Sequence, residues 1–198
     1  MRNQRGYTLI ELMIGLLVGL IVLSAVIYSF LTTLRSSRDV VNSSLLNNEV
    51  TAALDLMSGE IRRIGYDSDS STSPSNGYLK IVSGGSEVSS GNCIIYLYDR
   101  TGSDVASNAT YSGFRLNSGS IEYADGLAGS NMCAGTWTPV VDPRFNVSAL
   151  TITATSEALP STDSMFTVEI TVSANVVSDS EWKLDQVSKF VKVRNHYE

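Results

Sequence analysis

The hydrophobic pattern divides the chain into one long apolar run and a body of short alternating segments. Residues 12–31 form a stretch of twenty residues without a single Asp, Glu, Lys or Arg. An α-helix rises about 1.5 Å per residue, so this stretch spans roughly 30 Å, the thickness of a bilayer's hydrocarbon core. The pattern therefore predicts a membrane-spanning helix.

A secretory signal peptide is the alternative for this apolar run. Arg2 and Arg5 supply the basic segment that precedes the apolar part of such a peptide. However, the run is longer than usual for a signal peptide, and residues 28–35 contain no small-x-small cleavage site. We therefore expect the segment to stay on the protein.

Beyond the apolar run, the pattern becomes that of an amphipathic helix. Apolar residues recur at three- and four-residue steps, which places them on one helix face: Val50, Ala53, Leu54, Met57, Ile61 and Ile64. Gly65 follows the last residue of this series, and Arg62 and Arg63 lie in the final turn. Both features are typical of a helix C-terminus. The pattern predicts one helix from about Thr8 to about Ile64, with its amphipathic half over residues 35–66.

The rest of the chain reads as a loop followed by strands. Residues 67–77 are polar with Pro and Gly, which predicts a linker. Seven short segments then have the composition or alternation of strands: Tyr78–Val82, Ile94–Tyr98, Ser112–Leu116, Ser120–Tyr123, Ala149–Thr155, Phe166–Ser173 and Gln186–Val193. Because their apolar faces need a cover, we predict an α+β fold in which residues 78–198 form an antiparallel sheet packed against the helix.

The residues before the apolar run carry a specific motif. Glu11 lies between apolar neighbours. A carboxylate at the edge of a bilayer or inside it is unfavourable in free energy unless another group pairs with its charge. The sequence Arg5-Gly6-Tyr7-Thr8-Leu9-Ile10-Glu11-Leu12, behind a leader of residues 1–6, resembles the type III signal of type IV pilins and type II secretion pseudopilins. The resemblance implies that a prepilin peptidase cuts between Gly6 and Tyr7 and then N-methylates Tyr7. It also implies that Glu11 sets subunit register by pairing with the free amine of a neighbouring subunit's first residue.

The same resemblance implies a location, which charge alone does not decide. Arg2 and Arg5 precede the span while Arg35 and Arg38 follow it, so the positive-inside bias is weak. By resemblance, residues 7–34 cross the bacterial inner membrane once, the C-terminal domain lies in the periplasm, and the protein enters a pilus after assembly. The implied partners are prepilin peptidase, other minor pilins, the major pilin, the inner-membrane assembly platform and membrane lipid.

Cys93 and Cys133 are the only cysteines. A C-x-x-C motif is absent, and a zinc site is not expected because His196 is the sole histidine. If the body is periplasmic, two cysteines favour a disulfide, which would close a loop of about forty residues and contribute roughly 3–4 kcal/mol. The alternative is two buried, unpaired thiols.

A second resemblance concerns the body. Residues 53–66, 92–99, 113–116, 133–137 and 147–153 resemble the corresponding parts of PilW-type minor pilins. This implies a minor pilin that helps to initiate pilus assembly or belongs to the pilus tip complex. A minor pseudopilin of a type II secretion system and a tip adhesin or DNA-uptake module remain alternatives.

Composition narrows the remaining function classes. The net charge of −6 and the pI near 4.8 argue against general nucleic-acid binding, because phosphate recognition needs a concentrated basic surface. A local basic patch formed by Arg100, Arg115 and Arg144 remains an alternative site for binding DNA. The chain has no P-loop, and a Ser-His-Asp triad would depend on His196, so we predict a protein that is not an enzyme and needs no cofactor or metal.

Overall fold

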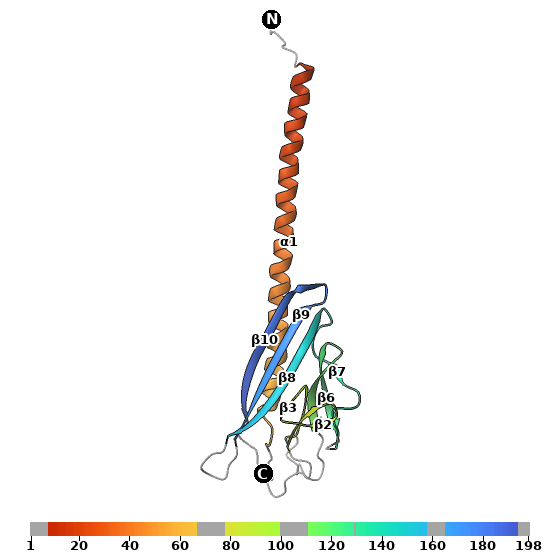
Figure 1. The fold of residues 1–198 in the computed structure, drawn as a ribbon, viewed down its shortest axis with the longest axis vertical. Helices are drawn as coiled ribbons and strands as arrows, with labels where there is room; N and C mark the ends of the chain where they lie inside the picture. Colours follow the sequence, from red (N-terminus) through yellow and green to blue (C-terminus); the bar gives the residue numbers. More distant parts are fainter. Residues whose placement is uncertain (1–7, 67–77, 100–110, 129, 158–164, 194–198) are drawn as a thin grey trace. The chain divides into compact units, whose positions relative to one another are not determined.

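The computed structural model describes residues 8–66, 78–99, 111–128, 130–157 and 165–193 (Figure 1). The chain forms two compact units, residues 1–42 and residues 43–198. Helix α1 (Leu9–Ile61) provides the described helical part of the first unit and the helix of the second. The predicted leader over 1–6 and the predicted linker over 67–77 lie outside the described residues.

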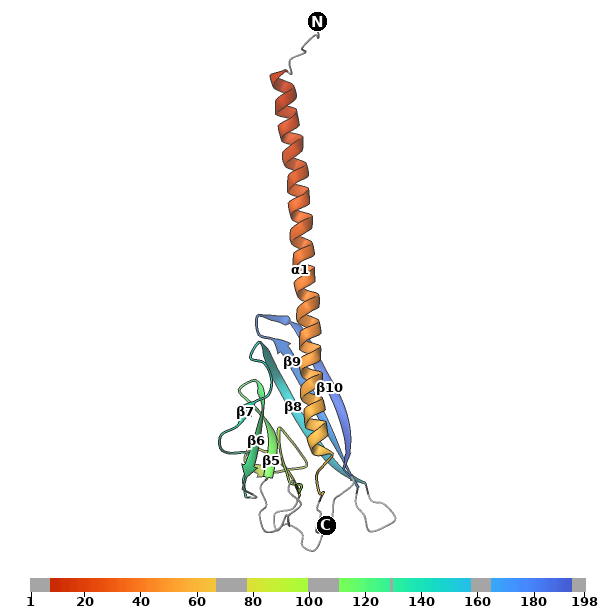
Figure 2. The same cartoon turned by 180° about the vertical axis from the view of Figure 1, so that it is seen from behind.

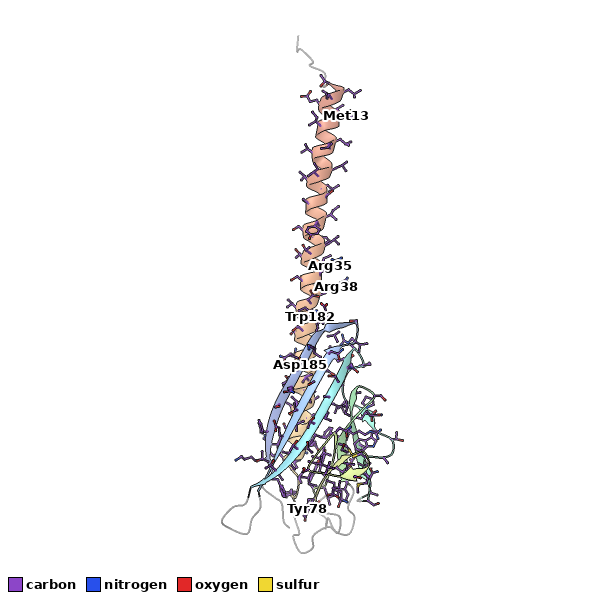
Figure 3. All side chains as sticks on the ribbon, in the orientation of Figure 1. Met13, Arg35, Arg38, Tyr78, Trp182 and Asp185 are labelled. Atoms are coloured by element: carbon purple, nitrogen blue, oxygen red, sulfur yellow. A yellow bond between two sulfur atoms is a disulfide. The ribbon has the colours of Figure 1, made fainter. Side chains whose placement is uncertain are left out.

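The first unit presents apolar side chains on all sides of α1. Leu9 and Leu16 are 77% and 67% exposed, and Figure 3 shows the side chains around Met13 projecting outward from the helix. The helix contains a stretch long and apolar enough to cross a membrane, and none of that stretch is buried within the protein. Ser24 Oγ donates to the carbonyl of Leu20 at 2.7 Å, so this hydroxyl is satisfied inside the helix.

The described residues of the second unit form ten strands, in two antiparallel sheets. A six-stranded sheet has the order β2-β1-β4-β5-β6-β7, and a four-stranded sheet has the order β10-β9-β8-β3. The strands of the first sheet are β1 (Leu79–Ser83), β2 (Ser86–Glu87), β4 (Cys93–Tyr96), β5 (Tyr111–Asn117), β6 (Ser120–Leu127) and β7 (Thr138–Pro139). The strands of the second are β3 (Ser90–Gly91), β8 (Phe145–Glu157), β9 (Met165–Val176) and β10 (Asp179–Val193).

One hydrophobic core joins the helix and both sheets of the second unit. The predicted helix face is buried throughout: Val50, Ala53, Leu54, Met57, Ile61 and Ile64. Figure 2 shows this part of α1 lying along β8, β9 and β10, and Lys189 of β10 forms an ion pair with Asp55 of the helix. In β9, Val168, Ile170 and Val172 are buried between more exposed polar residues, as the alternation predicts. The α+β fold, with a long helix packed on antiparallel sheet, is confirmed.

The end of α1 differs slightly from the prediction. The helix ends at Ile61, because the next turn tightens: Ile64 N–H donates to the carbonyl of Ile61 at 3.2 Å. Gly65 then has φ of 72°, and its N–H donates to the carbonyl of Leu97 at 3.1 Å. The glycine therefore turns the chain out of the helix and ties it to the segment after β4.

The strand pattern also differs in detail. All seven predicted strands are present, although β5, β6, β8, β9 and β10 are longer than expected. The two-residue strands β2, β3 and β7 were not predicted, and the strands divide between two sheets where a single sheet was expected.

Candidate functional site

The described part of the N-terminal motif forms the first turn of α1. Gly6 and Tyr7 lie outside the described residues. Thr8 and Glu11 bond reciprocally: Thr8 N–H donates to Glu11 Oε2 at 3.5 Å, and Glu11 N–H donates to Thr8 Oγ1 at 3.4 Å. This is the arrangement of a capping box, in which two side chains satisfy N–H groups that the first helical turn leaves unpaired. Glu11 is exposed, so its carboxylate has this local role and is also accessible to a partner.

Cys93 and Cys133 form the expected disulfide, with their Cα atoms 6.5 Å apart. Cys93 lies on β4 and is only 3% exposed. Cys133 lies between β6 and β7, is partly exposed, and has φ of 64°. The bond therefore joins a loop to an interior strand of the six-stranded sheet.

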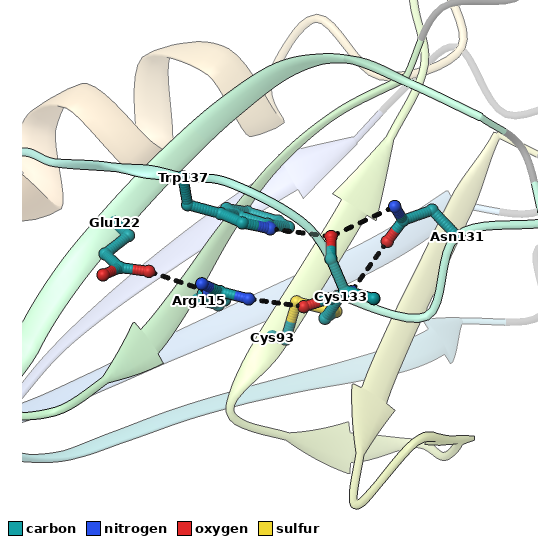
Figure 4. The surroundings of a disulfide bond; sticks show 7 residues. Cys93, Arg115, Glu122, Asn131, Cys133 and Trp137 are labelled. Carbon is teal, nitrogen blue, oxygen red and sulfur yellow. Dashed lines mark hydrogen bonds and ion pairs between the residues drawn. A yellow bond between two sulfur atoms is a disulfide. The ribbon is translucent and has the colours of Figure 1, made fainter.

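Arg115 on β5 joins this loop to β6, because it contacts Cys133 and Trp137 of the loop and Glu122 of β6 (Figure 4). Its Nε lies 2.8 Å from Glu122 Oε2, and its Nη1 donates to the carbonyl of Cys133 at 2.7 Å. Its guanidinium lies over the ring of Trp137, 4.8 Å from the centroid. Arg115 is also the direct cross-strand neighbour of Cys93. The patterns of the sequence did not identify this cluster, because its members are brought together only by strand pairing.

Trp137 completes the loop's attachment. Its Nε1 donates to the carbonyl of Ala134 at 3.0 Å, and Asn131 Oδ1 accepts from Ala134 N–H, also at 3.0 Å. Gly113 on β5 leaves room for the indole, since a Cβ there would lie 2.9 Å from Trp137 Cη2. The loop is thus anchored by contacts that do not involve the disulfide.

Glu60 joins the end of the helix to β4 and to the segment directly after it. Tyr98 OH donates to Glu60 Oε2 at 3.0 Å, and Tyr96 OH donates to the same oxygen at 3.3 Å. Arg63 Nη1 lies 3.2 Å from Glu60 Oε1. The Glu60 carboxylate at the end of the helix is therefore paired with two tyrosine hydroxyls and with Arg63.

Two of the three arginines of the predicted basic patch lie within the described residues, and both form ion pairs. Arg115 is paired with Glu122, and Arg144 forms a two-pronged pair with Asp142, with both N–O distances 3.0 Å. The hydrogen bonds from Arg144 lower the pKa of Asp142, and Asp142 in turn raises the pKa of Arg144. Arg100 lies outside the described residues. Arg115 and Arg144 therefore do not present unpaired charge to a nucleic acid.

Two protein families match this chain, one at its N-terminus and one over most of the remainder. A family described as "Prokaryotic N-terminal methylation motif" matches residues 1–27, which include Gly6, Tyr7 and Glu11. A family described as "Prepilin peptidase-dependent protein B" matches residues 39–193. The chain belongs to this second family. Membership of this family, together with the N-terminal methylation motif, is consistent with a pilin or pseudopilin.

Among solved structures, a type IV-like pilin from Thermus thermophilus is similar to this chain. The two are 11% identical with a TM-score of 0.48, and the match covers 77% of this chain and 99% of the other. No match to a curated protein is found.

Proposed function

We propose that the chain is a minor pilin of a type IV pilus, most like the PilW type, which helps to initiate pilus assembly or belongs to the tip complex. The observation that carries the proposal is the joint match of a methylation motif over 1–27 and a prepilin peptidase-dependent body over 39–193. The exposed apolar surface of the first unit supports it, because such a surface needs lipid or other apolar helices around it.

Processing is the first step of this function. Prepilin peptidase removes residues 1–6 by cutting between Gly6 and Tyr7, and the new terminus at Tyr7 is N-methylated. Gly6→Leu should leave the precursor uncut, whereas Gly15→Ala, which meets nothing within 4 Å, should be processed normally. A mature terminus at Tyr7 in the Gly6→Leu variant would show that this cleavage rule is wrong.

Glu11 then sets register by pairing with the amine of a neighbouring subunit's first residue. An unpaired carboxylate in an apolar bundle is several kcal/mol less favourable than a paired one. The capping box complicates the usual alanine test, because Glu11 also accepts from Thr8 N–H. Glu11→Gln separates the two roles, since glutamine keeps the capping acceptor but removes the charge.

Both Glu11→Gln and Glu11→Ala should be processed yet be absent from purified filaments. If Glu11→Gln enters filaments like the wild type while Glu11→Ala does not, capping and not charge pairing is the role of Glu11. Filament content is measured by shearing pili from cells and probing the fraction for the protein.

The proposal includes a location and partners. Residues 7–34 anchor the protein in the bacterial inner membrane as a single span, residues 35–66 continue the helix, and residues 67–77 link it to a periplasmic domain over 78–198. The disulfide supports this placement, because structural disulfides persist in oxidising compartments. The partners are prepilin peptidase, other minor pilins, the major pilin, the assembly platform and lipid.

A minor pseudopilin of a type II secretion system shares the same motif and architecture. Co-purification separates the two functions. The processed protein, extracted in detergent and captured by a tag after residue 198, should bring down other pilus subunits. Recovery of secretion-system subunits in their place would favour the pseudopilin.

A further inference from the structure

We propose that the Cys93–Cys133 disulfide forms and exchanges through the sulfur of Cys133, and that Arg115 is the positioning residue that holds the Cys133 loop in place for this reaction. The reaction partner is a small thiol or disulfide, for which glutathione disulfide is the probe. This inference concerns the body alone and does not depend on the proposed role in pilus assembly.

The two sulfurs differ in accessibility. Cys93 is 3% exposed on a strand that is paired on both sides, with Val82 of β1 and Arg115 of β5 as its direct neighbours. Cys133 is partly exposed and lies outside the regular strands. Thiol–disulfide exchange depends on access to the sulfur that is attacked. An external reagent therefore meets Cys133 first.

A pocket of about 220 Å³ adjoins the disulfide. Both cysteines line it, together with Asn92, Arg115, Asn117 and Met132. Arg115 and Asn117 both donate to Glu122, so the size of the pocket, and not its charge, suits a small thiol or disulfide. Met132, which is 37% exposed, adds an apolar contact at the same pocket.

The Arg115 contacts hold the loop independently of the disulfide. The bond from Nη1 to the Cys133 carbonyl, the pair with Glu122 and the stacking on Trp137 are all made by groups other than the sulfurs. In the reduced chain these contacts keep Cys133 beside Cys93. Closure of the bond is then an intramolecular step at high effective concentration.

The reaction has two balanced steps. The Cys133 thiolate attacks one sulfur of glutathione disulfide, forming a mixed disulfide and releasing one glutathione thiolate. The Cys93 thiolate then attacks Cys133 Sγ, forming the Cys93–Cys133 bond and releasing the second glutathione thiolate. Two protein thiols are oxidised, one glutathione disulfide is reduced, and the two protons lost by the cysteine thiols are taken up by the two glutathione thiolates, giving two glutathione thiols.

Single-cysteine variants of the full chain in detergent test the first step. With glutathione disulfide as the probe, mass spectrometry should show Cys93→Ser gaining a glutathionyl group on Cys133. In Cys133→Ser, the rate of glutathionylation at Cys93 should be lower by a factor of about ten or more, because Cys93 reacts only when the sheet opens. In guanidinium the two rates should converge. Equal rates in the folded variants, or faster reaction at Cys93, would overturn the proposal.

The role of Arg115 has a separate readout in the chain with both cysteines. In a glutathione redox buffer, Arg115→Gln should raise the ratio of Cys133 mixed disulfide to closed disulfide several-fold, because the loop is held less well. Arg144→Gln serves as the control, since Arg144 pairs with Asp142, and its ratio should match the wild type. Arg115→Lys, which keeps the cation, should give an intermediate ratio and replaces Arg115→Gln if circular dichroism shows that variant to be unfolded. A folded Arg115 variant with the wild-type ratio would refute the positioning role.

Discussion

Replacing Met57 by alanine tests how the helix is held in the body of the protein. Met57 is completely buried on the face of α1 that enters the core, whereas the adjacent Leu56 is 46% exposed. The two side chains are of similar size and lie on the same helix. Met57→Ala and Leu56→Ala therefore differ mainly in whether the side chain is in the core.

The expected magnitudes follow from this difference in burial. Truncating a buried methionine to alanine lowers the free energy of unfolding by about 2–5 kcal/mol, because the surroundings fill the cavity only in part. A substitution at an exposed position such as Leu56 should change it by no more than about 0.5 kcal/mol. For a domain of this size, each kcal/mol shifts Tm by about 2–4 °C, so Met57→Ala should lower Tm by roughly 4–20 °C.

The assay is thermal unfolding of the full chain in detergent, monitored by tryptophan fluorescence. Trp137 is only 7% exposed, so its emission should change when the core opens. Near-equal Tm values for Met57→Ala and Leu56→Ala, or a larger loss for Leu56→Ala, would refute the packing of α1 described above.

Glycine substitutions and an acid titration test other parts of the structure. Gly113→Ala should lower the free energy of unfolding by about 1–3 kcal/mol, because its Cβ would lie 2.5 Å from the Ile94 carbonyl oxygen and 2.9 Å from Trp137 Cη2. Gly59→Ala, on an open helix surface, should raise it by about 0.5–1 kcal/mol, and chemical denaturation measures both. Because Arg144 lowers the pKa of Asp142 in the folded state, the pair stabilises the fold above the carboxyl's ordinary value of 3.8 and loses that effect as the pH falls through the lowered pKa. Arg144→Gln should move the Asp142 midpoint, measured by NMR, back toward 3.8, and an unchanged midpoint would argue against the pair.

The sequence predicted those elements whose residues carry a repeating pattern. The buried face of α1 repeats at helical spacing, and β9 alternates cleanly, so both are recognisable without a structure. The strands β2, β3 and β7 have two residues each, which is too short to show any alternation. The division into two sheets depends on which strands pair, and local pattern carries no information on pairing partners.

The candidate sites show the same limit. Thr8 and Glu11 have the S/T-x-x-E spacing of a capping box, so this local role was available from the sequence and was missed. The contacts of Arg115 with Glu122 and Trp137 could not be inferred, because they require the β5–β6 register and the path of the following loop. In the sequence, Arg115 differs in no way from a surface cation.

The mass of the mature protein tests the central claim most directly. The full chain, expressed with prepilin peptidase and extracted from membranes, should lose Met1–Gly6 and carry a methyl group on Tyr7. The same chain expressed without the peptidase should retain its leader. A mature chain that keeps its leader in the presence of the peptidase, or that begins at a residue other than Tyr7, would contradict the account.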